Sequence, residues 1–198
     1  MSGNSTTYLY LITHAHTQID PSVEVTQWQL SPQGQVQAQA LAEQPFWASV
    51  DQIILSSEAK TRLTIEPVLM QRALPVSVHP QFDELLRPGW VEAYQAQVAR
   101  AFAQPDQPAG EWEPASHAQQ RMLNGVASLH RCFAGQTLAL VGHGLTLSLY
   151  RAALLGQSRV LLSEWQRLSF AAVALVELES GRLLQDFRAV AGESPRGS

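Results

Sequence analysis

The sequence predicts an α/β fold, a three-layer sandwich in which helices cover both faces of a mostly parallel sheet. Short apolar runs rich in β-branched residues alternate with longer segments of helical spacing, which is the pattern of α/β folds. Four apolar runs predict buried strands: residues 8–13, 52–57, 75–79 and 137–142. A last apolar segment, residues 170–190, turns at Ser180-Gly181 and predicts a hairpin with strands of antiparallel character.

Helical segments connect the predicted strands. Ser31 and Pro32 form a typical helix N-cap and first helical position, and apolar residues follow at helical spacing. The other predicted helices cover residues 58–72, with an irregularity at Pro67, and residues 91–103, 116–133 and 143–156. Residues 80–117 are the least regular part, and we expect them to form a lid-like insert. We expect one domain over residues 1–191 and a disordered tail at 192–198.

The composition is that of a globular protein and argues against several partners. The chain has 198 residues, 45% hydrophobic and 15% charged, which is enough for one domain with a core. The net charge of -4 argues against nucleic acid, because no basic surface would release counterions. No apolar run is long enough to span a membrane and no signal region precedes the first one, so we expect no membrane partner. The single cysteine, Cys132, excludes an intrachain disulfide; we expect it in the core and the protein in the cytoplasm.

Two of the predicted strands are followed directly by histidine. "LITHAH" places His14 after residues 8–13, and "LALVGHG" places His143 after residues 137–142. The carboxyl ends of parallel strands meet at one edge of the sheet, where ligands bind in open α/β folds. We therefore expect His14 and His143 to share a site although about 130 residues separate them.

Six segments in order give the chain a resemblance to a known family. They read "LITHAHT", "LSPQGQVQAQALAE", "IILSSEAKT", "FDELLRPGW", "GEWEPASHAQQR" and "LALVGHG". Together they resemble the landmarks of the histidine phosphatase superfamily, the phosphoglycerate-mutase-like proteins. The resemblance covers nearly the whole chain and implies the fold of that family.

The resemblance also implies roles for individual residues. His14 matches the nucleophile that becomes a phosphohistidine, His143 the second histidine, and Glu84 the general acid. Gly144 would let the backbone approach an anion, and the helix that starts there would point free N–H groups into the site. Arg121 matches an arginine that forms a structural ion pair. No metal and no cofactor are implied, and the expected partner is a small phosphorylated molecule or another small anion.

The chain departs from the family pattern where phosphate is bound. Thr13 and Thr61 stand where the family has arginines, and Asp20 stands where it has asparagine. The residues expected to bind substrate are Thr13, Thr17, Asp20, Thr61 and Gly144. Removing one preorganised donor costs about 10²–10³ in rate, so losing two could cost on the order of 10⁴. Arg62 is one position late, and Lys60 is the only lysine in the chain.

Three functions remain open from the sequence. The intact set of His14, His143 and Glu84 favours a phosphomonoesterase acting through a phosphohistidine, impaired or re-specialised. The missing arginines favour a catalytically inactive family member that binds a ligand or a protein. His14 and His16 would lie on one side of an extended segment. Together with His143, Asp20 and Glu84 nearby, they make a metal-dependent hydrolase a third option. A homodimer is an option because relatives commonly form one.

Overall fold

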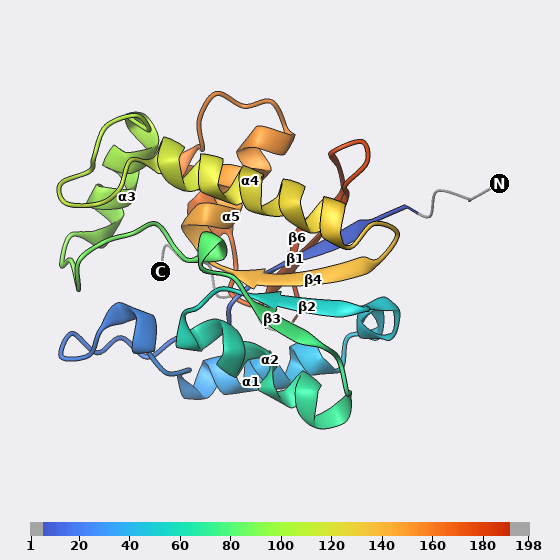
Figure 1. The fold of residues 1–198 in the computed structure, drawn as a ribbon. Helices are drawn as coiled ribbons and strands as arrows, with labels where there is room; N and C mark the ends of the chain where they lie inside the picture. Colours follow the sequence, from blue (N-terminus) through green and yellow to red (C-terminus); the bar gives the residue numbers. More distant parts are fainter. Residues whose placement is uncertain (1–5, 191–198) are drawn as a thin grey trace.

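A six-stranded sheet forms the centre of the protein in the computed structural model, which describes residues 6–190 (Figure 1). Its strands lie in the order β3-β2-β4-β1-β5-β6. Their bounds are β1 Tyr8–Thr13, β2 Gln52–Leu55, β3 Val76–Val78, β4 Thr137–Gly142, β5 Ala172–Glu177 and β6 Arg182–Ala189. The first four pair in parallel, while β5 pairs antiparallel with β1 and with β6. The predicted parallel sheet with a final hairpin is confirmed.

Six α-helices and three 3₁₀-helices complete the described residues. The α-helices are α1 Pro32–Ala42, α2 Ala59–Gln71, α3 Tyr94–Ala103, α4 Ala115–Cys132, α5 Gly144–Leu154 and α6 Leu162–Arg167. The 3₁₀-helices are η1 Val25–Gln27, η2 Pro45–Ser49 and η3 Pro80–Phe82. Figure 1 shows α1 and α2 on one side of the sheet and α4 and α5 on the other, which gives the three predicted layers.

The alternation of side chains along the strands explains the layers. Leu9 and Leu11 of β1 pack with residues of α4 and α5, while Ile12 packs with residues of α1 and α2. Successive strand residues point to opposite faces, so an all-apolar strand fills a core on both sides. The sequence of β1 therefore requires helices above and below it.

A local signal sets the start of α1. The Ser31 hydroxyl accepts a 3.1 Å hydrogen bond from Gly34 N, which confirms the predicted N-cap of α1. Pro67 lies inside α2, which continues to Gln71. The expectation that Cys132 lies in the core is wrong: it is the exposed last residue of α4, and its neighbour Phe133 packs against the core instead.

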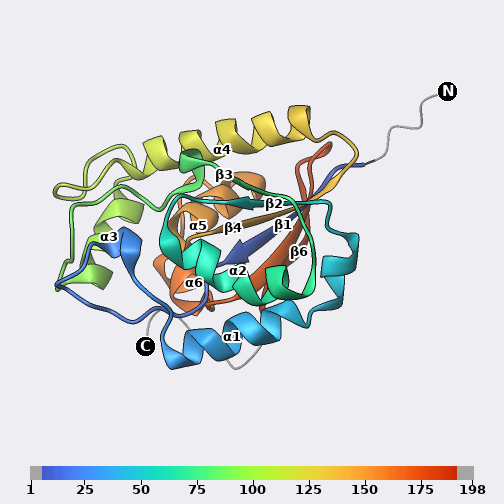
Figure 2. The same cartoon turned by 60° about the horizontal axis from the view of Figure 1, so that its bottom comes forward.

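The segment predicted as a lid-like insert has its own apolar cluster. Leu85, Val98, Phe102 and Trp112 pack with residues of α5 and with Trp165 of α6. Helix α6, a short helix of six residues, was not predicted from the sequence. Figure 2 shows the loop after β1, drawn in blue, beside the α3 segment. The insert therefore extends the sheet domain at the edge where the strands end.

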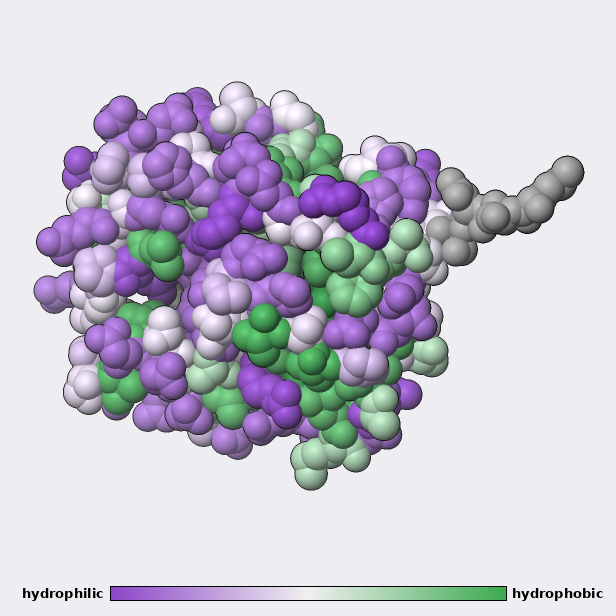
Figure 3. Space-filling view, viewed as in Figure 1, coloured by the Kyte–Doolittle hydropathy of each residue, from purple (hydrophilic) through white to green (hydrophobic). Residues whose placement is uncertain are grey.

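The surface is mostly hydrophilic on the side seen in Figure 3, with apolar residues gathered over α2 and β3. Exposed large apolar side chains of these two elements include Met70 and Val78. Within residues 6–190, no helix has both the length and the apolar character needed to cross a membrane. The tail predicted at 192–198 lies outside the described residues.

Candidate active site

His14 and His143 lie side by side at the carboxyl ends of neighbouring strands. β1 and β4 pair in parallel with Thr13 opposite Gly142, so the next residue of each strand reaches the same edge. His14 N donates to Gly142 O at 2.9 Å, and the two imidazole centroids are 5.3 Å apart. Both side chains are buried. The structure brings together the pair that the strand pattern predicted.

The backbone determines which nitrogen of His14 carries the proton. Nδ1 lies 2.8 Å from the carbonyl oxygen of Ala15. A carbonyl oxygen can only accept a hydrogen bond, so Nδ1 is the protonated nitrogen in this contact. In the neutral imidazole the lone pair is then on Nε2. His14 is thus held in the tautomer that a nucleophilic Nε2 requires.

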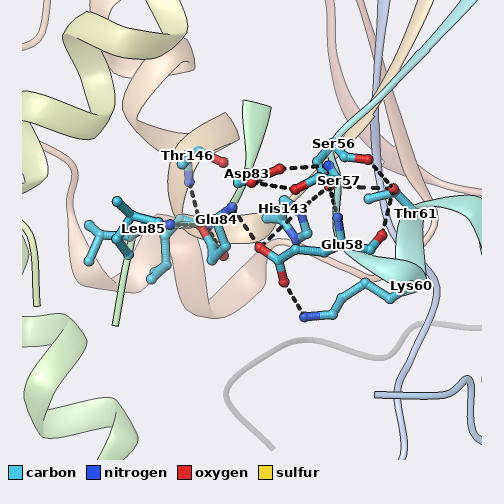
Figure 4. A network of polar contacts seen from close by, with 12 residues as sticks. Ser56, Ser57, Glu58, Lys60, Thr61, Asp83, Glu84, Leu85, His143 and Thr146 are labelled. Carbon is cyan, nitrogen blue, oxygen red and sulfur yellow. Dashed lines mark hydrogen bonds and ion pairs between the residues drawn. The ribbon is translucent and has the colours of Figure 1, made fainter. Parts of the chain in front are cut away.

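His143 is positioned by residues that follow β2. Its Nε2 lies 2.7 Å from the Ser56 hydroxyl oxygen and 3.5 Å from Oε1 of Glu58 (Figure 4). Because β2 is adjacent to β4 in the sheet, the residue that follows β2 reaches the residue that follows β4. The serine and the glutamate fix the ring of His143 from the side of α2.

Glu58 and Lys60 form a buried ion pair beside the histidines. Oε2 of Glu58 accepts a 2.6 Å hydrogen bond from Nζ of Lys60, and the side chains are 5% and 3% exposed. The other oxygen, Oε1, accepts from Glu84 N at 2.8 Å. Burial lowers the pKa of Lys60, and the charge of Glu58 opposes that shift. Glu58 therefore links His143, Lys60 and the segment that bears Glu84.

Glu84 caps the N-terminus of α5. Its Oε1 accepts from Leu85 N and Thr146 N, both at 3.0 Å, and its Oε2 accepts from Leu145 N at 3.1 Å. The expectation that this helix points free N–H groups into the site is wrong at Leu145 and Thr146. The first N–H groups of a helix attract negative charge, and here the protein supplies its own carboxylate.

The hydroxyls of Thr13 and Thr61 are bonded to backbone groups. Thr13 Oγ1 donates to Ser169 O and accepts from Ala172 N, both at 2.9 Å, which ties β1 to the start of β5. Thr61 Oγ1 donates to Glu58 O at 2.9 Å in the first turn of α2. Neither residue is among those that line the pocket described below.

The other residues expected to bind substrate are divided between the pocket and its surroundings. Thr17 lines the pocket. Asp20 instead accepts from Ser22 N and Ser22 Oγ at 2.9 and 2.6 Å in the loop after β1, and these bonds lower its pKa. Gly144 is buried as the first residue of α5 and does not line the pocket.

A pocket of about 440 Å³ opens over the two histidines. Its polar lining includes His14, His143, Glu84, Lys60 and Arg87. Its other lining residues are His16, Thr17, Ile19, Val25, Trp28, Gln33, Gly89, Trp90, Val91, Tyr94, Trp165 and Phe170. The strand-end histidines thus lie at the polar part of a pocket whose remaining wall is largely aromatic and aliphatic.

Comparison with known proteins identifies the family. The sequence model of the histidine phosphatase superfamily (branch 1) matches residues 9–188. The chain belongs to the histidine phosphatase superfamily. No curated protein matches the sequence.

Three solved structures share the fold of this chain over nearly their whole length. YhfR of Bacillus stearothermophilus is 21% identical, with a TM-score of 0.77 and coverage of 94% of this chain and 98% of that one. A putative alpha-ribazole-5'-P phosphatase from Escherichia coli is 23% identical, with a TM-score of 0.70 and coverage of 94% and 100%. A mycobacterial glucosyl-3-phosphoglycerate phosphatase is 21% identical, with a TM-score of 0.70 and coverage of 93% and 99%. At these identities the likeness shows the fold.

Two cations, Lys60 and Arg87, line the pocket of this superfamily member without standing at the expected arginine positions. Lys60 comes from the first turn of α2, and Arg87 comes from the loop before α3. The Arg87 guanidinium lies 5.2 Å from the Tyr94 ring and 5.5 Å from the Trp112 ring. Sequence reasoning missed Arg87 and Glu58. The available signal was their position. Glu58 directly follows the predicted strand 52–57, and Arg87 directly follows "FDELL".

Arg121 anchors the segment that carries Glu84. Its Nη1 donates to Gln81 O and Asp83 O at 2.9 and 3.0 Å, and its Nη2 pairs with Glu113 at 2.6 Å. This is the structural ion pair that the resemblance implied.

A three-residue cluster of histidine, cysteine or carboxylate side chains fit to bind a metal is absent from residues 6–190. His16 instead contacts the Ser31 hydroxyl through Nδ1, at 2.8 Å.

Proposed function

We propose that this histidine phosphatase is a phosphomonoesterase that forms a phosphohistidine at His14, with a re-specialised anion site. The observation that carries the proposal is the placement of His14, whose Nδ1 contacts Ala15 O and whose ring lies 5.3 Å from His143. A neutral imidazole with its lone pair on Nε2, beside a second buried histidine, is the arrangement that nucleophilic attack on phosphorus requires.

The reaction proceeds in two steps, phosphorylation of His14 and hydrolysis of the phosphohistidine. His14 Nε2 attacks phosphorus, an N–P bond forms, and the P–O bond to the leaving group breaks. The leaving oxygen takes the electron pair and a proton from the protonated carboxyl group of Glu84. Water then attacks phosphorus and gives its proton to Glu84 while the N–P bond breaks, which releases phosphate and restores His14.

Lys60 and Arg87 support the proposal as the cations that would bind phosphate oxygens. An ammonium group has three hydrogens, and the contacts of Lys60 assign one of them to Glu58. Two hydrogens of Lys60 are therefore available to a phosphate oxygen. A lysine lacks the bidentate geometry of an arginine, so we expect slow turnover in comparison with relatives that have both arginines.

The test measures phosphate release from a panel of small phosphomonoesters in the presence of a chelator. The parent is compared with His14→Ala and with His117→Ala, which changes an exposed histidine of α4. We expect turnover in the parent and in the His117 control and none in His14→Ala. A phosphoprotein that is stable in base and labile in acid should accumulate in the parent. Equal rates in all three proteins would contradict the proposal.

A second candidate is a non-catalytic module that binds a small anion. It is favoured by Glu84, whose carboxylate already occupies the N–H groups of Leu145 and Thr146, and by the two threonines bonded to backbone. Calorimetric titration with inorganic phosphate separates the candidates. Phosphate binding that Lys60→Met abolishes, with no turnover of any ester in the panel, would favour the binding module.

A further inference from the structure

The lining of the pocket is rich in aromatic side chains. Three of the chain's five tryptophans line the pocket: Trp28, Trp90 and Trp165. Tyr94 and Phe170 add two more rings. The pocket volume of about 440 Å³ exceeds the roughly 150 Å³ cavity that accommodates a benzene molecule. A ring therefore fits together with a phosphate group.

Two tryptophans from different loops meet over the pocket. Trp28 follows η1 and Trp90 precedes α3, and their ring centroids are 5.8 Å apart. The Trp28 indole is held by hydrogen bonds from its Nε1 to Asp20 O and Val23 O, at 3.0 and 3.2 Å. Trp90 is 38% exposed. The loop after β1 thus fixes the Trp28 ring, while the Trp90 ring is partly exposed. Figure 2 shows the loop after β1 and the segment before α3 as neighbours.

The aromatic wall begins next to the proposed nucleophile. The Phe170 ring centroid lies 5.5 Å from that of His14 and 4.9 Å from that of His16. On the other side, Nζ of Lys60 lies 5.9 Å from the Trp28 ring. A phosphate bound by Lys60 beside His14 would therefore place the rest of its molecule against aromatic faces.

The pocket favours a small anion whose body is uncharged where it meets the tryptophans. The cationic side chains that line the pocket are Lys60 and Arg87. The side chains of Trp28, Trp90 and Trp165 are uncharged and cannot form an ion pair with a second anionic group. Flat rings gain from offset or edge-to-face contacts with tryptophan beyond the burial of their area. A saturated ring of similar size gains only the burial term.

We propose, as an extension of the proposed function, that the substrate is a phosphomonoester of a planar aromatic or heteroaromatic compound. Its phosphate lies between His14 and Lys60, and its ring packs against Trp28 and Trp90. The specificity of the site is thus determined by the loop after β1 and the loop before α3, which supply these two tryptophans.

The experiment measures binding of matched phosphonates by calorimetry, because a C–P bond removes any dependence on turnover. The ligands are 2-phenylethylphosphonate, 2-cyclohexylethylphosphonate and methylphosphonate. The proteins are the parent, Trp90→Ala, Trp90→Phe and Leu86→Ala, a control at an exposed side chain of the same loop that does not line the pocket. We expect the parent and the control to bind the phenyl ligand roughly three- to tenfold more tightly than the cyclohexyl ligand.

Trp90→Ala should weaken that preference and leave the affinity for methylphosphonate within about twofold, while Trp90→Phe keeps most of the preference. Equal affinities of the parent for the phenyl and cyclohexyl ligands would overturn the inference, and this result needs no variant to fold. A ring preference without turnover of 2-phenylethyl phosphate would support the ligand class and refute the phosphatase. Turnover of both 2-phenylethyl and 2-cyclohexylethyl phosphates at equal kcat/KM would support the phosphatase and refute the aromatic ligand class.

Discussion

The carboxylate of Glu58 binds the ammonium group of Lys60 at 2.6 Å, and both side chains are removed from water. Such a pair is sensitive to loss of one partner, because the remaining charge stays buried without compensation. Here the pair also contacts the active site, since Glu58 lies 3.5 Å from His143 Nε2 and Lys60 lines the pocket. The ionisation of Lys60 therefore reports on both stability and anion binding.

The first prediction is that Lys60 titrates below the ordinary lysine pKa of 10.5. Burial disfavours its charged form, and Glu58 limits the shift, so Glu58→Gln should lower the pKa further. Lysine labelled with ¹³C gives one side-chain signal, because the sequence has one lysine. Its pH titration by NMR gives the pKa directly. A midpoint at or above 10.5 would contradict the predicted direction.

The same shift determines how this group affects stability. Because the pKa of Lys60 is lower in the folded than in the unfolded protein, the contribution of Lys60 to the free energy of unfolding is fully present above pH 10.5. That contribution is lost as pH falls through the folded-state pKa. Bound phosphate should move the midpoint up, because a second anion near the ammonium favours its charged form.

The second prediction concerns the energy of the ion pair. Lys60→Met should lower the free energy of unfolding by about 3–5 kcal/mol, because it leaves Glu58 buried without its partner. The double variant Glu58→Gln with Lys60→Met should lose less than the sum of the single variants. Denaturant unfolding of the four proteins measures this coupling. Arg182→Met, at an exposed pair with Glu177, serves as the control and should change stability by less than about 1 kcal/mol.

The fold was largely predictable because its signals are local or follow from topology. Apolar runs predicted the strands, Ser31 predicted the start of α1, and the parallel sheet placed His14 beside His143. These inferences needed only the periodicity of each segment and the rule that parallel strands end at one edge.

The site was less predictable because several of its contacts join segments that are distant in sequence. Glu84 reaches α5 only because the insert folds back over the sheet, and no local pattern announces that contact. The hydroxyl of Thr13 bonds to Ser169 and Ala172, more than 150 residues away. The resemblance predicts that Thr13 stands where the family has arginine, but it does not predict where the hydroxyl of Thr13 points.

The third prediction separates the two roles of Glu84, helix cap and general acid. Glu84→Gln keeps one carbonyl oxygen for the N–H groups of α5, so stability should fall by about 0.5–2 kcal/mol. Turnover of an alkyl phosphate should fall roughly 10²–10⁴-fold, because the leaving alkoxide loses its proton donor. An aryl phosphate should lose less, since a phenol has a pKa near 10 and leaves more readily as an anion.

Steady-state kinetics on an alkyl and an aryl phosphomonoester test this prediction, with Glu43→Gln as a control at an exposed residue that follows α1. If Glu84→Gln reduces stability but changes neither rate, the residue is a cap and not the acid.

The fourth prediction is that introducing arginine at position 13 does not create a phosphate contact. Thr13 is 0% exposed and its hydroxyl bridges two backbone groups, so Thr13→Arg should destabilise the fold by roughly 3 kcal/mol or more. Thr13→Ser keeps the hydroxyl and should be tolerated much better. Unfolding and phosphate calorimetry on both variants check this. A stable arginine variant with tighter phosphate binding would show that the backbone contacts of Thr13 are dispensable.

The fifth prediction concerns Gly34, where α1 passes close to the histidine loop. A Cβ at this position would lie 1.9 Å from the carbonyl oxygen of His16, a backbone atom that cannot rotate away. Gly34→Ala should therefore destabilise the protein by about 1–3 kcal/mol, although alanine is the better helix former by about 1 kcal/mol. Val36→Ala changes an exposed residue of the same helix and should stay within about 0.5 kcal/mol of the parent.

Because the clash pushes on the segment that carries His16 and Thr17, Gly34→Ala should also weaken methylphosphonate binding, measured by calorimetry under conditions where the variant is folded. Parent-like stability in Gly34→Ala would mean that α1 can move away from the pocket loop without loss.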